Sequence, residues 1–213
     1  MSLNPDSPLG KILTKLLDLV VLQLYFVLTS IPVFTIGAGL TAMFSVCRKL
    51  QQDAVISVTK TYFVEFKASF GKSTLAWLVV AVAAALLGIS VSYYYHAAGS
   101  FWILFLVLAC LLLVLVFIEF LYVFPLIAWF DNSLSAHFKN APLLAVFHLK
   151  TTLLVTALYA FVFLLVVRIL PITLFIAFSG SAFYASLMFT KVFAVYDPAA
   201  APAEELSDAR EEA

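Results

Sequence analysis

Ionisable residues are scarce in this 213-residue sequence, because Lys, Arg, Asp and Glu together make up 11% of it. Soluble proteins contain about 25%. The twelve basic and twelve acidic side chains balance, so no basic surface for nucleic acid is predicted. The two cysteines and three histidines show no ligand spacing, so neither a disulfide framework nor a metal site is predicted.

The sequence also lacks the motifs of common enzyme classes. It contains no HExxH, no GxSxG and no GxxxxGK. We therefore predict no catalytic residue, no cofactor and no enzymatic activity.

Apolar residues dominate instead, at 64% of the chain, with 21 Phe. The first long apolar run covers residues 16–47, whereas one membrane crossing takes about 20 residues. Pro32 removes a hydrogen-bond donor, and Gly37 and Gly39 relax the backbone. The run therefore predicts two short helices, at about 10–31 and 37–50, which meet at a helix break.

Four further apolar runs predict crossings at about 73–92, 101–124, 143–167 and 172–195. The predicted fold class is all-α, a polytopic transmembrane helical bundle with six membrane-embedded helices, of which the first two form a short broken hairpin. The alternative has five transmembrane helices, with the first run as one tilted crossing. Residues 1–197 are expected to form a single integral membrane domain. The acidic, Ala- and Pro-rich residues 198–213 are predicted to be disordered.

Residues 55–72 predict an amphipathic helix on the cytoplasmic side of the membrane. Its aromatic face is expected to contact either the lipid headgroups or a partner protein. The residues proposed for this contact are Tyr62, Phe63, Phe66, Phe70, Lys60 and Lys67.

Basic residues near membrane helices concentrate on the cytoplasmic side, and this rule sets the predicted orientation. If the first apolar run is a hairpin, ten basic residues lie inside and only Arg168 lies outside near a membrane end. The ten are Lys11, Lys15, Arg48, Lys49, Lys60, Lys67, Lys72, Lys139, Lys150 and Lys191. Both termini are then cytoplasmic.

Glu119 is the acidic residue of greatest interest, because it lies within the apolar run 101–124. A carboxylate in hydrocarbon is costly and needs a partner or water. Tyr122 and Gln23 are the candidate partners that complete this intramembrane polar site. Glu119 is expected either to bind a proton or polar solute in a cavity, or to make a structural hydrogen bond between helices.

Several stretches resemble the YesL-like family of bacterial membrane proteins, a domain family of unassigned function. SIPVFTIGA at residues 30–38 is similar to the proline and TIG signature of that family. YFVEFK at 62–67, FPLIA at 124–128 and KNA at 139–141 follow in the expected order. The resemblance covers residues 9–197 and leaves out the acidic tail.

The resemblance implies a link with carbohydrate uptake, because genes for YesL-like proteins commonly lie beside those for carbohydrate ABC importers and glycoside hydrolases. We therefore expect a non-enzymatic accessory subunit that binds importer permeases within the lipid bilayer. The alternative is an autonomous carrier of a small solute or ion, with a cavity around Glu119 and the helix break at Pro32 and Gly37. A homo-oligomer is compatible with the sequence but is not predicted.

Overall fold

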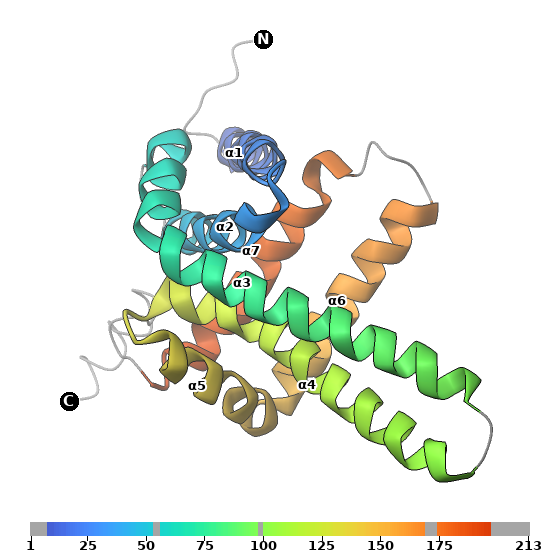
Figure 1. The fold of residues 1–213 in the computed structure, drawn as a ribbon. Coiled ribbons are helices and arrows are strands. Elements are labelled where there is room, and N and C mark those ends of the chain that lie inside the picture. The colour runs from blue at the N-terminus through green and yellow to red at the C-terminus, as the bar shows by residue number, and fades with distance from the viewer. Residues whose placement is uncertain (1–7, 53–55, 98–99, 169–173, 197–213) are drawn as a thin grey trace.

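The computed structural model describes residues 8–52, 56–97, 100–168 and 174–196, and within these ranges all regular elements are helices (Figure 1). The elements are α1 (Pro8–Thr29), η1 (Val33–Thr35), α2 (Ile36–Gln51), α3 (Val58–His96), α4 (Ser100–Trp129), α5 (Leu134–Phe147), α6 (Leu149–Arg168) and α7 (Leu174–Phe193). The all-helical fold class predicted from the apolar runs is confirmed for this part of the chain. The tail at 198–213 and the turn between α6 and α7 lie outside the described residues.

The first long apolar run forms two helices with a break between them, as predicted. α1 ends at Thr29, and the 3₁₀ turn η1 leads into α2. The Pro32 carbonyl accepts hydrogen bonds from the amide of Thr35 at 2.8 Å and from its hydroxyl at 2.6 Å. The Thr35 hydroxyl also lies within bonding distance of the Thr29 carbonyl. The break is therefore a hydrogen-bonded turn that joins the ends of both helices.

Gly37 and Gly39 belong to α2 and not to the break itself, which corrects their expected role. A Cβ at Gly37 would lie 2.3 Å from the Ser73 carbonyl oxygen and 2.6 Å from the Trp77 Cβ. A Cβ at Gly39 would approach the Phe26 ring to 3.1 Å. These glycines allow neighbouring helices to approach α2 closely, and Pro32 alone marks the break.

α3 is one continuous helix of 39 residues, whereas the sequence predicts an amphipathic helix at 55–72 followed by a separate crossing. The Ser57 side chain caps its start by accepting from the Lys60 amide. No proline interrupts the segment. Its polar residues favour a more polar environment than the apolar residues that follow, but they do not break the helical backbone. At 1.5 Å per residue the helix is about 58 Å long, roughly twice the thickness of a bilayer's hydrocarbon core.

Two prolines also lie inside helices where the sequence suggests helix boundaries. Pro125 lies within α4, which continues to Trp129, and Pro142 lies within α5 instead of opening the next helix. The chain bends later, at His148, where α5 and α6 meet at 99°. α5 begins after Ser133, whose side chain caps the helix by accepting from the Ala136 amide.

α2 is the most enclosed helix of the bundle. It packs against α3, α4 and α7, and Ala38, Ala42, Val46 and Cys47 along it are fully buried. α1 and α6 both pack on α7. The far halves of α3 and α4 extend together beyond the other helices as a hairpin (Figure 1). The bundle thus has a compact end built around α2 and a projecting arm.

In the described part of the chain, three helical segments are long and apolar enough to cross a membrane, namely residues 33–51, α3 and the Phe101–Trp129 part of α4. A fourth is added if the bent pair of α5 and α6 counts as one broken span. The structure therefore supports a helical membrane protein. The number of six embedded helices stays a prediction.

Candidate functional site

Glu119 does not meet the partners proposed for it. Its Oε2 atom is buried without a hydrogen-bond partner. The Tyr122 hydroxyl bonds the Thr152 hydroxyl at 2.7 Å, and the Gln23 Oε1 accepts from the Ser179 amide at 2.8 Å. Tyr122 and Gln23 are thus bonded to other residues, whereas the Glu119 Oε2 atom has no hydrogen bond.

Tyr122 has a structural contact at the bend between α5 and α6. The Thr152 hydroxyl bonds the Ala145 carbonyl at 2.9 Å, so the Tyr122 hydroxyl is the donor to Thr152 when that bond is made. Both side chains are buried, where an unmade hydrogen bond would be costly. This chain of contacts holds α4 against the bend.

The aromatic face expected on the first part of α3 turns inward. Tyr62 is fully buried, and its hydroxyl bonds the Thr29 hydroxyl at 2.7 Å. Tyr25 of α1 stacks on Tyr62 at 5.9 Å and meets the edge of Phe63 at 5.2 Å. Tyr62 is therefore not available to lipid or to a partner, which corrects its expected role.

Phe66 continues this internal cluster, since it is partly buried and stacks on Tyr62 at 6.2 Å. Phe70 remains 38% exposed. The outer face of α3, which we call the outer α3 face, presents Lys60, Val64 and Lys67. A shallow hollow of about 310 Å³ lies here between Lys60, Phe63 and Lys67.

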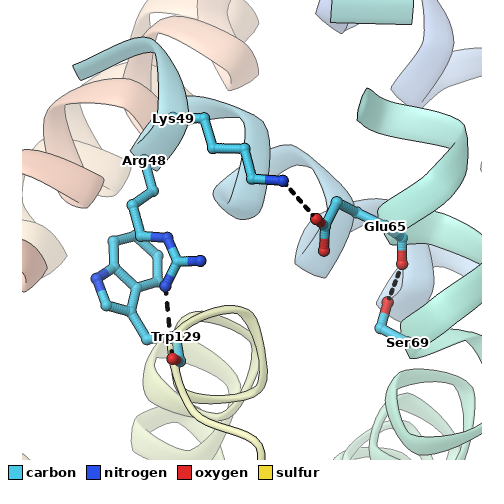
Figure 2. A network of polar contacts seen from close by, with 5 residues as sticks. All are labelled: Arg48, Lys49, Glu65, Ser69 and Trp129. Atoms are coloured by element: carbon cyan, nitrogen blue, oxygen red, sulfur yellow. Dashed lines mark hydrogen bonds and ion pairs between the residues drawn. The ribbon is translucent and has the colours of Figure 1, made fainter. Parts of the chain in front are cut away.

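A polar network, not foreseen from the sequence, joins α2, α3 and α4 (Figure 2). The Lys49 ammonium donates to Glu65 at 2.7 Å, and the Ser69 hydroxyl donates to the Glu65 carbonyl at 2.8 Å. The Arg48 guanidinium lies 5.3 Å from the centre of the Trp129 ring and donates to the Trp129 carbonyl at 3.4 Å. A cation over an indole face is a favourable contact. The network holds the charged end of α2 between its neighbours.

Lys72 extends this end of the bundle to the loop after α4. Its ammonium donates to the Asp131 carboxylate at 2.6 Å and to the Asn132 carbonyl at 3.2 Å. The hydrogen bond and the positive charge of Lys72 hold the pKa of Asp131 below its usual value. Lys72 thus joins α3 to the segment between α4 and α5.

The sequence offers one signal for these contacts, because the charged residues involved lie at the ends of apolar runs. Charge position alone does not specify the pairing. Arg48 and Lys49 are neighbours in sequence, yet they contact different helices because successive side chains of a helix point about 100° apart.

Two other cavities lie between helices away from the outer α3 face. One, of about 390 Å³, is apolar and lies between α2, α4, α6 and α7, with Met43, Phe120 and Thr156 among its lining residues. The other, of about 350 Å³, lies between the end of α4, α5 and the end of α7, and we call it the amide pocket. It is lined by Leu126, Phe130, Asn132, Asn140, Leu143, Leu144, Phe147, Phe193 and Tyr196. Neither cavity is lined by Glu119, Pro32 or Gly37.

The long apolar helices and their exposed apolar faces define a membrane-embedded helical protein. Comparison with known proteins agrees with this class without assigning an activity. The model of a family described as "Protein of unknown function, DUF624" matches residues 19–91. That range holds the second half of α1, all of α2 and most of α3.

The chain is also similar to the "Uncharacterized protein YteU" of Bacillus subtilis (strain 168). The two are 33% identical over 146 residues, which is 68% of this chain and 65% of the relative. The match therefore spans slightly less than two thirds of that relative's length. No solved structure matches the chain.

Proposed function

We propose that this protein is a non-enzymatic membrane subunit that assists carbohydrate ABC import by binding the permeases of an importer. The observation that carries the proposal is the outer α3 face, where Lys60 and Lys67 flank the exposed Val64 on a helix longer than a membrane crossing. The link with carbohydrate rests on the resemblance to YesL-like proteins. We propose membership of that family for the whole of residues 9–197, beyond the 19–91 segment matched by the family model.

The proposal places six embedded helices in the bacterial inner membrane: α1, α2, the second half of α3, α4, α6 and α7. α1 and α6 expose large apolar side chains such as Leu28 and Phe163, which supports their lipid contact. Both termini are then cytoplasmic, because the break between α1 and α2 returns the chain to its starting side. A reporter fused before Lys11 tests this topology, and external activity of that reporter would favour the five-helix arrangement.

The outer α3 face is the proposed contact with the permease. Val64 is 54% exposed, and Phe63 forms one wall of the adjacent hollow. Lys60 and Lys67 stand on either side of it, one turn from Val64 in each direction. This arrangement suits a partner surface on which an apolar side chain is surrounded by acidic residues.

The test is a mild-detergent pull-down of the tagged full-length chain from its native host grown on complex carbohydrate. We expect importer permeases in near-stoichiometric amounts, identified by mass spectrometry. The double variant Lys60→Glu/Lys67→Glu should lose them, whereas Lys150→Glu, an exposed lysine on α6, should retain them. Recovery of the chain alone, beside an importer complex that survives the same extraction, would refute the proposal.

An autonomous carrier is the second candidate, and one observation favours it. The Glu119 Oε2 is buried without a partner in an apolar helix, as expected of a group that takes up a proton or a solute during transport. Solute or proton flux into liposomes that contain only this chain would support this function. A Glu119→Gln variant should then lose the flux, and full flux in that variant would exclude the role of Glu119.

A further inference from the structure

We propose that the amide pocket binds a neutral polyhydroxyl group, such as a sugar ring. Its lining, as far as the described residues form it, holds two carboxamides, one phenol and several aromatic rings, and none of these residues carries a carboxylate or an amine. Carboxamides both donate and accept hydrogen bonds, as vicinal hydroxyls require, and aromatic faces suit the C–H surface of a sugar ring. The volume of about 350 Å³ falls within the range of small-molecule sites.

The polar wall of the pocket is held in position by contacts outside it. The carbonyl of Asn132 accepts from the Lys72 ammonium, which is itself paired with Asp131. The Tyr196 hydroxyl bonds the His148 Nε2 at 3.1 Å, and the two rings meet edge to face at 5.9 Å. Lys72 and Asp131 are thus paired with each other, and the polar residues that line the pocket are Asn132, Asn140 and Tyr196, which carry neutral donors and acceptors.

The aromatic wall is equally fixed. Phe193 is fully buried, stacks on Phe189 at 5.6 Å and meets the edge of Phe130 at 5.4 Å. A wall that is ordered before the ligand arrives lowers the entropic cost of binding. The pocket therefore combines a rigid aromatic floor with the hydrogen-bonding groups of Asn132, Asn140 and Tyr196, which are exposed residues.

Two sources can supply such a group. One is a free sugar in the cytoplasm, and the other is the headgroup of a glycolipid. The rim residues Leu143 and Phe147 are 55% and 73% exposed, so an acyl chain attached to a headgroup would meet an apolar surface there. Both sources present the same neutral hydroxyls to Asn132 and Asn140.

The first experiment uses the full-length chain in polymer-extracted native nanodiscs, which avoids alkyl-glycoside detergents whose sugar headgroups would compete. Saturation-transfer NMR with glucose and with maltose is expected to show transfer to the sugar ring protons. The double variant Asn132→Ala/Asn140→Ala should bind about tenfold more weakly, the loss expected from one or two hydrogen bonds. Gln52→Ala removes an exposed carboxamide outside the pocket and should bind as the parent does.

The second experiment distinguishes the lipid source. Native mass spectrometry of the chain in discs that contain glucosyl diacylglycerol and phosphatidylglycerol should show preferential retention of the glycolipid if the headgroup is the ligand. Transfer to free sugars supports the cytoplasmic source. Absence of both signals, or equal signals in the double variant, would overturn the proposal. Both experiments use the purified chain, so they stand apart from the recovery of permeases in the pull-down.

Discussion

At Gly37 the neighbouring helices leave no room for a side chain. A methyl group there would overlap the Ser73 carbonyl oxygen and approach the Phe124 ring to 2.9 Å. The backbone oxygen cannot rotate away as a side chain can. The close packing of α2 on α3 therefore depends on the absence of a side chain at this position.

We expect Gly37→Ala to lower the free energy of unfolding by about 1–3 kcal/mol, the usual cost of overpacking. Gly71→Ala is the matched control, because a Cβ at Gly71 would meet no atom within 4 Å. That change should leave stability unchanged or raise it by up to about 1 kcal/mol, since alanine favours the helix. Denaturation in mixed micelles, followed by tryptophan fluorescence, measures both, and equal effects of the two changes would contradict the packing account.

Asp131 makes a contribution to protein stability that depends on pH. Its carboxyl has a lowered pKa because it accepts from Lys72, so its contribution to stability is fully present above the ordinary Asp pKa. The contribution is lost as the pH falls through the lowered value. The pair is exposed, and its effect is therefore small and weakened by salt.

The expected result is a slightly lower melting temperature for Asp131→Asn than for the parent at neutral pH and low salt. The difference should vanish as the pH approaches the lowered pKa of Asp131. Thermal unfolding across a pH series, repeated at high salt, checks this. A difference that persists in strong acid would show that the Lys72 pair is not its cause.

At the scale of elements, the sequence predicts the first hairpin well and α3 less well. Pro32 is a local signal for a helix break, because proline lacks the N–H donor whatever the tertiary surroundings are. The polar residues of 55–72 indicate a change of surroundings, which a helix can cross without interruption. The sequence also shows that the same segment has an aromatic face. It does not show that Tyr25 of α1 covers this face, because that contact depends on the tertiary structure.

The candidate site was predicted less well for a related reason. Glu119, Tyr122 and Gln23 are all polar residues in apolar runs, and their positions along the helices are evident from the sequence. Whether they meet depends on how each helix is rotated about its axis, which helix–helix packing decides. The residues of the amide pocket were missed because Asn132, Asn140 and Tyr196 come together only where the end of α4, the helix α5 and the end of α7 meet.

The length of α3 predicts two environments along one helix. In inside-out vesicles of a Cys110→Ala chain, a water-soluble maleimide should label Ala68→Cys but not Ala85→Cys. Both positions are exposed on the protein, so burial does not distinguish them. Hydrocarbon should protect position 85 alone, and labelling of Ala85→Cys in detergent confirms that its thiol is reactive. Equal labelling of both positions in vesicles would contradict the proposed membrane placement.

At the scale of the whole molecule, Gln51 links helices from opposite ends of the chain. Its amide nitrogen donates to the Phe183 carbonyl at 3.0 Å, and its oxygen accepts from the Thr190 hydroxyl at 3.4 Å. The contact joins α2 to α7 near the charged end of the bundle. The stability of α2 therefore depends on the last helix.

Gln51→Leu is expected to lower the unfolding free energy by about 1–2 kcal/mol, because it removes the side-chain hydrogen bond to the Phe183 carbonyl and the longer contact with Thr190, whose hydroxyl keeps its bond to the Ser186 carbonyl. Gln52→Leu, at an exposed neighbouring position, should have little effect. Chemical denaturation of both variants in the same micelles provides the measurement. A larger loss for Gln52→Leu than for Gln51→Leu would remove the link to α7.

The packing of α1 and α2 against α7 has a consequence for biosynthesis. A ribosome delivers the first hairpin to the membrane well before α7 exists, so the buried face of α2 must wait for its final neighbour. During that interval the nascent chain presents Gln51 and the small residues of α2 to lipid or to the insertion machinery. A message truncated before codon 174 would yield a chain that inserts its first helices yet never completes its interior, and membrane proteases should degrade it.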